Sequence, residues 1–241
     1  MPKAVYQDIY LDLKRRIEEG GFAYGSFLPS ESELTTSYAC SRSSIRRALG
    51  QLASDGYVQS QQGKGVRVIR DPQLDVTRGY DGFETFMEMA ERLGFDPHTR
   101  CLALENVTAD EQLAGLTGFP VGTRLIRALR ARYAGDQAVS TDDSYILAGL
   151  ASGLTPELVE AGIYNYLEGE LGVGIATSRR ILTVEAVTEA DERYIDLEGF
   201  NAVAVMRSHT FDTNGNMLEF TETRQRPGFF SQYTTVMRPQ R

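Results

Sequence analysis

The first part of the chain carries apolar residues at the spacing of an amphipathic helix. Between residues 5 and 19 the large apolar side chains recur three or four positions apart, at Tyr6, Ile9, Tyr10, Leu13 and Ile17. On a helix this spacing places them on one face, which can pack against a core. Two glycines at positions 20 and 21 end the pattern, so the sequence predicts a helix over residues 5–19.

Capping residues predict two more helices. Ser30 and Glu33 stand at the spacing of a capping box and predict a helix over about residues 31–38. Ser41 is placed to cap a third helix, which Gly56 ends as a C-terminal glycine. Two β-prone runs at 57–59 and 66–69 then flank a glycine-rich basic tip and predict a hairpin. Three helices followed by a hairpin are the arrangement of a winged helix-turn-helix, a DNA-binding module.

Charge supports a nucleic-acid partner for this part of the chain. The whole chain of 241 residues has a net charge of −8. Residues 1–70, however, carry ten Lys and Arg residues against seven Asp and Glu residues, a net charge of +3, whereas the remaining 171 residues carry −11. Because Lys and Arg drive phosphate binding, this asymmetry indicates a small basic module joined to a larger acidic one.

The third helix and the hairpin tip supply the candidate DNA contacts. Serine and arginine side chains near the start of a recognition helix can donate hydrogen bonds to phosphates and to guanine edges, and a basic wing can contact the backbone. We assign Arg46 to a base, and Arg42 and Lys64 to phosphates. The full predicted set is Arg42, Ser43, Ser44, Arg46, Arg47, Gly63, Lys64 and Gly65.

Beyond residues 71–80, which lack an apolar period, strand-like runs dominate the chain. They cover residues 99–107, 123–134, 137–146, 175–186, 202–212 and 216–226. Helices are predicted at 83–93, 109–116, 156–172 with a break near Gly162, and 189–195. This mixture predicts an α+β fold on a mainly antiparallel sheet. We therefore expect a DNA-binding domain at 1–70, a linker at 71–80 and a second domain at 81–241.

Four motifs in the first domain resemble the GntR family of bacterial transcription regulators. They are Leu28-Pro29-Ser30-Glu31, Ser41-Arg42 with Ile45-Arg46, Gly56-Tyr57-Val58 and Gln62-Gly63-Lys64-Gly65-Val66. The second domain resembles the UTRA effector-binding domain, whose fold is similar to that of chorismate lyase. Its runs Ile163-Tyr164 and Phe220-Thr221-Glu222-Thr223-Arg224 are most similar to the branch that contains trehalose-operon repressors. The resemblance implies a repressor of sugar-utilisation genes that a phosphorylated sugar, such as trehalose 6-phosphate, releases from DNA.

Two predicted strands carry the candidate effector ligands. Arg130 and Arg132 share one strand face and can converge on a phosphate or carboxylate, unless both are solvated or paired with acids. On the last long strand a row of polar residues suits sugar hydroxyls, or is simply an exposed face. The helix start at Gly82-Phe83 can add backbone amides. The resemblance assigns the arginines to an acidic effector and places further ligands around it, so the predicted set is Gly82, Phe83, Arg130, Arg132, Ser144, Glu219, Thr221, Thr223 and Gln225.

The sequence offers no readable catalytic group, metal-ligand cluster or dinucleotide-binding motif. The two histidines, His98 and His209, lack partners at a spacing that would close a metal site. We therefore expect no enzyme activity, no cofactor and no metal. Two alternatives stay open: a small-acid enzyme on a chorismate-lyase-like domain, and a regulator whose second domain only dimerises.

Location and partners follow from the same features. No uncharged apolar run approaches the ~20 residues that span a bilayer, and Cys40 and Cys101 form no disulfide framework, so we expect a cytoplasmic protein without a membrane partner. The expected partners are a double-stranded DNA operator with an inverted repeat, a small phosphorylated effector, and a second copy of the chain in a homodimer.

Overall fold

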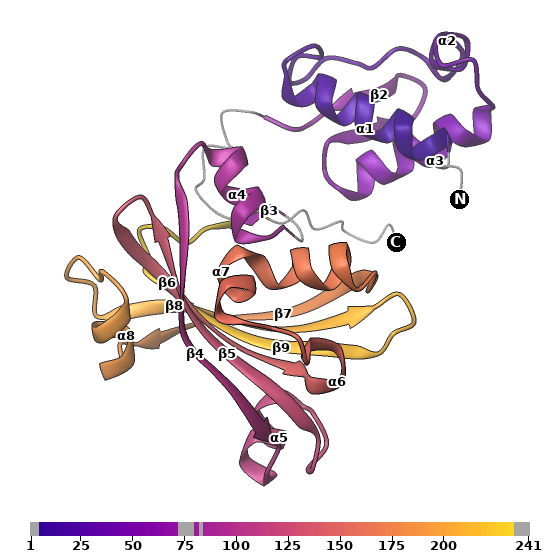
Figure 1. Cartoon of the computed structure of the whole chain (residues 1–241). Helices are drawn as coiled ribbons and strands as arrows, with labels where there is room; N and C mark the ends of the chain where they lie inside the picture. Colours follow the sequence, from indigo (N-terminus) through magenta and orange to yellow (C-terminus); the bar gives the residue numbers. More distant parts are fainter. Residues whose placement is uncertain (1–4, 72–79, 82–83, 234–241) are drawn as a thin grey trace. The chain divides into compact units, whose positions relative to one another are not determined.

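A computed structural model describes residues 5–71, 80–81 and 84–233 of the chain. The chain divides into two compact units, an N-terminal unit that contains residues 1–77 and a C-terminal unit of residues 78–232 (Figure 1). Most of the predicted linker and both Gly82 and Phe83 lie outside the described residues. In the described part of the chain, no helix is long and apolar enough to cross a membrane.

The N-terminal unit consists of three helices and an antiparallel hairpin, which confirms the predicted winged helix-turn-helix. The elements are α1 (Val5–Glu18), α2 (Glu31–Ser37), α3 (Arg42–Ser54), β1 (Val58–Gln61) and β2 (Gly65–Val68). Ser30 and Glu33 form the predicted capping box at the start of α2, and Ser41 caps α3. These caps satisfy backbone amides that a helix start otherwise leaves without partners.

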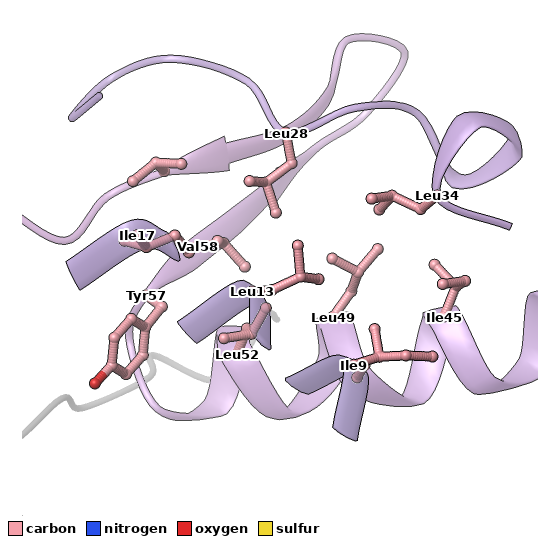
Figure 2. Close-up of a cluster of buried hydrophobic side chains, with 12 residues drawn as sticks. Ile9, Leu13, Ile17, Leu28, Leu34, Ile45, Leu49, Leu52, Tyr57 and Val58 are labelled. Carbon is pink, nitrogen blue, oxygen red and sulfur yellow. The ribbon is translucent and has the colours of Figure 1, made fainter. Parts of the chain in front are cut away.

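Apolar side chains at helical spacing hold the N-terminal unit together. Figure 2 shows Ile9 and Leu13 of α1 directed toward Leu49 and Leu52 of α3, in a core that also includes Val58 of the hairpin. Each is nearly or fully inaccessible to solvent. Complete burial of such an aliphatic side chain contributes about 1.5–3 kcal/mol, so this core fixes α3 against α1 and positions the recognition helix.

The C-terminal unit contains a six-stranded sheet whose neighbouring strands are all antiparallel, as predicted. Its order is β4-β5-β6-β9-β8-β7. The strands are β4 (Pro97–Thr108), β5 (Arg124–Ala134), β6 (Gln137–Leu147), β7 (Ile175–Ala186), β8 (Ala202–Asp212) and β9 (Met217–Gln225). Two-residue strands, β3 (Tyr80–Asp81) and β10 (Gln232–Tyr233), lie before and after this sheet in the sequence.

Helices pack on both faces of the sheet. They are α4 (Phe86–Leu93), α5 (Glu111–Thr117), α6 (Ala148–Ala151), α7 (Pro156–Tyr164), the π-helix η1 (Asn165–Glu170) and α8 (Glu189–Tyr194). On one face, Val159 and Ile163 of α7 pack against Ile126 and Ile146 of the sheet. On the other, the side chains around α5 pack against Phe220. The one-turn helix α6 was not among the predicted elements.

The start of α4 differs from the prediction. The helix begins at Phe86 instead of Phe83, because Thr85 caps it and forms a capping box with Glu88. The buried residues of α4 are Phe86, Met89 and Ala90, whereas Met87 is 41% exposed. Thr85 and Glu88 therefore define the helix start that we had assigned to residues 82 and 83.

The predicted break at Gly162 is confirmed. Gly162 has φ 121° and ψ 114° inside α7, a conformation that side-chain-bearing residues rarely adopt. The chain then continues as η1, and π-helical turns often occur at functional sites. The break changes the direction of the helix next to the polar face of the sheet.

Candidate functional site

The start of α3 presents several of the residues predicted to contact DNA. The Ser41 hydroxyl accepts a hydrogen bond from the Ser44 amide at 3.2 Å and lies 2.8 Å from the Ser43 hydroxyl. Arg42 and Ser43 are exposed, and Ser44 is half-buried. Hydroxyl groups and a helix N-terminus thus gather at one exposed point, which is an arrangement that binds phosphate.

Arg46 and Arg47 already have partners within the N-terminal unit. The Arg46 Nε donates to the Glu31 carboxylate of α2 at 2.9 Å, while 69% of the Arg46 side chain stays exposed. Such exposed ion pairs contribute about 0–1 kcal/mol, so Arg46 can exchange Glu31 for DNA at little cost. The Arg47 guanidinium instead lies 3.9 Å from the centre of the Tyr6 ring, a cation–π contact that holds it toward α1.

The tip of the hairpin projects Lys64 between two glycines. Gly63 and Gly65 have φ values of 75° and 114°, which only glycine adopts without strain, and they allow the tight turn between β1 and β2. Lys64 and both glycines are exposed. The tip of the hairpin therefore offers the Lys64 cation between two residues without side chains, which suits close approach to a phosphate backbone.

A polar pocket lies in the C-terminal unit between the sheet, α7 and the start of α4. The space within it is about 730 Å³ when the open solvent at its mouth is included. Five of the six strands contribute to its wall. The lining residues are Glu84, Thr85, Phe86, Met87, Arg130, Arg132, Asp142, Gly162, Ile163, Tyr164, Asn165, Ser178, Arg180, Met206, Ser208, Glu219, Thr221 and Thr223.

A buried carboxylate bridges the two arginines at one end of this pocket. Asp142 Oδ2 lies 2.9 Å from Arg132 Nε and 3.4 Å from Arg130 Nη2. Arg132 also donates to Thr99 at 2.8 Å, and Asp142 accepts from Thr223 at 2.8 Å. Burial raises the pKa of Asp142, but the two guanidiniums and the hydrogen bonds outweigh burial and hold that pKa below its usual value. The three charges of this cluster sum to +1, and the Glu219 carboxylate of the same pocket also acts electrostatically on Arg130.

Arg130 has a buried donor that the described structure leaves without a partner. Its Nη2 donates to Ser144 Oγ at 2.7 Å, whereas its Nε is buried and makes no hydrogen bond. Burial, together with the neighbouring Arg132, lowers the pKa of the Arg130 guanidinium. Buried polar groups nearly always find partners, so this Nε identifies a position where an acceptor from a ligand would be stabilising.

Next to this cluster, on the same face of the sheet, the pocket is lined by hydroxyl groups and a carboxylate. Glu219 is 2% exposed and accepts a hydrogen bond from the Tyr164 hydroxyl at 2.6 Å. Burial and the Glu219 carboxylate raise the pKa of Tyr164 well above its usual value, so Tyr164 remains a donor. Thr221 shares a 2.8 Å hydrogen bond with Ser144, which in turn holds Arg130. The anionic and hydroxyl-bearing parts of the pocket are thus coupled through Ser144.

Most of the predicted effector residues converge on this pocket. Arg130, Arg132, Glu219, Thr221 and Thr223 line it. Two other described members of the predicted set, Ser144 and Gln225, are buried and do not line the pocket. Ser144 contacts two lining residues.

Gln225 lies outside the set of lining residues, although its strand face is correct. It is 1% exposed, and neither atom of its side-chain amide has a hydrogen-bond partner in the described structure. The predicted backbone contribution of Gly82 and Phe83 lies outside the described residues. The amides at the start of α4 belong instead to the turn that Thr85 caps.

Several lining residues were not predicted. Ser178 and Arg180 alternate on β7, and Ser208 lies on the neighbouring strand β8. The sequence shows that Ser178 and Arg180 share one face of a predicted strand, but it does not show that β8 and β7 follow β9 in the sheet. Tyr164 belongs to the Ile163-Tyr164 run that resembles the UTRA domain, and it lines the pocket together with Gly162, where the helix breaks.

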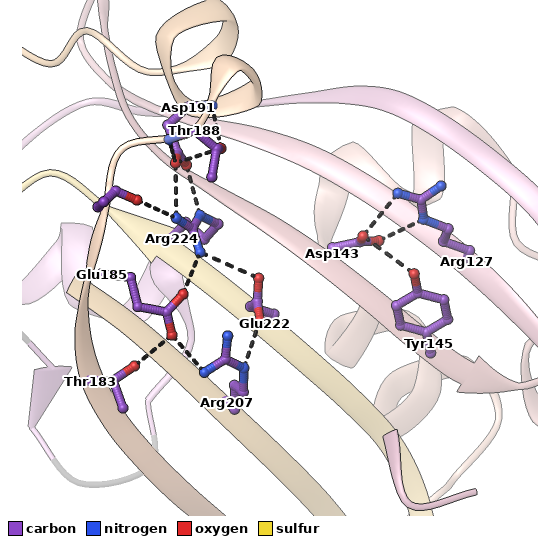
Figure 3. Close-up of polar contacts among 11 residues, drawn as sticks. Arg127, Asp143, Tyr145, Thr183, Glu185, Thr188, Asp191, Arg207, Glu222 and Arg224 are labelled. Atoms are coloured by element: carbon purple, nitrogen blue, oxygen red, sulfur yellow. Dashed lines mark hydrogen bonds and ion pairs between the residues drawn. The ribbon is translucent and has the colours of Figure 1, made fainter. Parts of the chain in front are cut away.

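The other face of the sheet carries a separate network of ion pairs (Figure 3). Arg207 binds Glu185 and Glu222, each at 2.7 Å, and Arg224 binds Glu185 at 3.0 Å and Asp191 of α8 at 2.8 Å. The Arg207 hydrogen bond is the largest influence on the pKa of Glu185, which falls to about 2. These arginines therefore hold α8 and the strands together and do not line the pocket.

A winged helix-turn-helix joined to a unit with a polar pocket defines a class of protein, the DNA-binding regulator with an effector domain. The chain belongs to the GntR family of bacterial regulators and carries a UTRA domain. Residues 5–68 match the model described as bacterial regulatory proteins, gntR family, and residues 92–230 match the UTRA domain.

Known relatives and solved structures agree with this assignment. The chain is 31% identical over 218 residues to the HTH-type transcriptional regulator TreR of Bacillus subtilis, covering 90% of this chain and 91% of TreR. The crystal structure of the possible transcriptional regulator YydK from B. subtilis superposes with a TM-score of 0.78 at 21% identity, covering 98% of this chain and 100% of that one. The effector-binding domain of the B. subtilis trehalose repressor TreR matches 59% of this chain and 99% of its own length, with a TM-score of 0.53 and 24% identity.

Proposed function

We propose that the chain acts in the cytoplasm as a repressor of sugar-utilisation genes and that a phosphorylated sugar resembling trehalose 6-phosphate releases it from its operator. The carrying observation is the buried cluster of Arg130, Arg132 and Asp142, with net charge +1 and an unpaired Arg130 Nε. An anion at this end would satisfy that donor and balance that charge.

The hydroxyl-lined part of the pocket supports a sugar as the uncharged part of the effector. Glu219 and the hydroxyls of Thr221, Thr223 and Tyr164 present several hydrogen-bonding atoms within one pocket. Sugar hydroxyls both donate and accept, so a mixture of hydroxyl and carboxylate groups complements them. A phosphate at the arginines and a ring near Glu219 would use both ends of the pocket.

The N-terminal unit supports an operator with two half-sites, bound by a homodimer. A single winged helix-turn-helix offers one recognition helix, and a two-fold dimer that reads an inverted repeat doubles the contacts. The TreR effector-domain structure describes that relative as a trehalose repressor, which favours repression over activation. We propose that effector binding favours a dimer geometry in which the two recognition helices no longer fit both half-sites.

Calorimetric titration tests the effector. Trehalose 6-phosphate and glucosamine 6-phosphate should each be compared with the unphosphorylated parent sugar, and the product of each titration should be checked for turnover. Tighter binding of a phosphorylated member, without turnover and with loss of operator binding, is the expected result. Turnover would favour the enzyme alternative, and equal affinity for the parent sugar would remove the phosphate from the proposal.

A further inference from the structure

The polar pocket also contains residues on β7 and β8 that the proposed function does not use. They are Ser178 and Arg180 of β7 and Ser208 of β8. These two strands form one side of the sheet, whereas Arg130 and Arg132 lie on β5, toward the other side. A single pocket thus joins polar groups from both sides of the sheet, and only those on β5, β6 and β9 have so far been given a role.

The register of the strands places the additional residues on the same face as the predicted effector ligands. Cross-strand pairing aligns four polar residues, one from each of four neighbouring strands: Ser144 of β6, Thr221 of β9, Ser208 of β8 and Arg180 of β7. Residues directly opposite each other on neighbouring strands share a face of the sheet. Because neighbouring strands lie about 4.8 Å apart, this polar row extends roughly 14 Å from β6 to β7.

The β7 side of the pocket offers groups that complement a neutral sugar ring. The Arg180 Nε donates to the Ser178 hydroxyl at 3.4 Å, and the apolar side chain of Met206 lines the pocket on β8 beside Ser208. Hydroxyls and a guanidinium can bind the hydroxyl groups of a ring, and an apolar side chain can pack against its C–H face. The Glu219 carboxylate on β9, the strand next to β8, disfavours a second anion on this side.

We propose that Ser178, Arg180 and Ser208 bind a second, uncharged ring of the effector, so that the pocket takes a phosphorylated disaccharide in preference to a phosphorylated monosaccharide. The inference rests on the phosphorylated sugar proposed above and assigns a second subsite to it. The phosphate lies at the arginine pair of β5, the ring that carries it lies over β6 and β9, and the second ring lies over β8 and β7. A monosaccharide phosphate leaves the last of these positions without a ligand.

Calorimetric titration of the full chain with trehalose 6-phosphate and with glucose 6-phosphate tests the second subsite. Both ligands carry a phosphorylated glucose ring, and only trehalose 6-phosphate has a second ring. The wild type should bind trehalose 6-phosphate at least about tenfold more tightly, because only this ligand reaches the guanidinium of Arg180. Arg180→Ala should lower the affinity for trehalose 6-phosphate by roughly tenfold and leave that for glucose 6-phosphate within about twofold. Ser208→Ala should act in the same direction, by about two- to tenfold.

Arg179→Ala is the matched control for the loss of an arginine from β7. Arg179 is exposed, directly precedes Arg180 and, by strand alternation, lies on the opposite face of the sheet, so this variant should bind both ligands like the wild type. Retained binding of glucose 6-phosphate also shows that a variant is folded.

Two results would overturn the second subsite while leaving the phosphorylated effector intact. One is equal affinity of the wild type for the two phosphorylated ligands. The other is an Arg180→Ala variant that loses affinity for both ligands alike or for neither. If neither phosphorylated ligand binds more tightly than trehalose itself, the proposed effector is wrong and the second subsite fails with it.

Discussion

Replacement of Arg130 by alanine should change effector affinity far more than it changes the free energy of unfolding. Arg130 is 5% exposed, its Nε has no partner in the described structure, and burial lowers its pKa. The guanidinium is therefore costly to the protein when no effector is bound. We expect Arg130→Ala to reduce effector affinity strongly and the free energy of unfolding only slightly.

The neighbouring contacts indicate the magnitude. After Arg130→Ala, Asp142 retains Arg132 at 2.9 Å and Thr223 at 2.8 Å, and Ser144 retains Thr221 at 2.8 Å. No buried charge loses its last partner, so the stability loss should stay well below the ~3–5 kcal/mol that follows when a buried ion pair is broken. A charge-assisted hydrogen bond to the effector contributes about 1.5–3 kcal/mol, which corresponds to a roughly ten- to hundredfold loss of affinity.

The assay combines calorimetric titration of the effector with denaturant unfolding of the same preparation. Arg127→Ala is the matched control, because Arg127 lies on the same strand, binds Asp143 at 2.8 Å (Figure 3) and, by strand alternation, lies on the face opposite Arg130. Operator binding without effector should remain near wild type in both variants. The reasoning is refuted if Arg130→Ala binds the effector as tightly as wild type, or if Arg127→Ala weakens binding equally.

Three further predictions concern DNA binding, acid stability and the helix break. Arg46→Ala should weaken operator binding by ~1–3 kcal/mol and relax sequence preference. Lys64→Ala should weaken binding to all DNA sequences alike and reduce the slope of log affinity against log salt concentration by about one. Fluorescence anisotropy at several salt concentrations checks both, and unchanged binding would contradict the assignment. Because the pKa of Glu185 lies at about 2 instead of 4.5, its stabilisation is complete above pH 4.5 and is lost as the pH falls toward 2. Glu185→Gln should therefore flatten the pH dependence of the unfolding free energy in that window, and an unaltered slope would count against the ion pairs. Because Gly162 has a φ of 121°, Gly162→Ala should lower the free energy of unfolding by at least ~1 kcal/mol, measured by thermal unfolding. Gly149→Ala in α6, where an added methyl meets nothing within 4 Å, should leave that free energy unchanged or raise it.

Local patterns predicted much of the fold. Strands β7 and β8 match the predicted runs 175–186 and 202–212 at both ends, because strand-forming residues and flanking turn residues indicate the same boundaries. The predicted start of α4 at Phe83, after Gly82, was wrong by three residues. The capping box of Thr85 and Glu88, which is also present in the sequence, sets the start of the helix at Phe86. The four-residue helix α6 carries too short a pattern to be predicted, and packing of the fully buried Ala151 helps to hold it.

Strand alternation predicted only which residues of the candidate site share a face of their strand. Alternation placed Arg130 and Glu219 on the faces that form the pocket. It did not reveal that Asp142 joins Arg130 to Arg132, because that contact depends on β5 and β6 pairing in a particular register. Gln225 shares the correct face but lies further along β9 than the pocket extends.

The position of Asp142 has a consequence for selectivity among anions. With Asp142 between them, Arg130 and Arg132 have a counter-ion that belongs to the protein itself. Chloride or inorganic phosphate must compete with this carboxylate and also lose translational freedom on binding, a cost that the tethered Asp142 does not bear. A larger anion that also binds the polar residues around Glu219 offsets that cost through its second set of contacts. For the anionic effector proposed above, the internal counter-ion should therefore set an affinity threshold that abundant small ions do not reach.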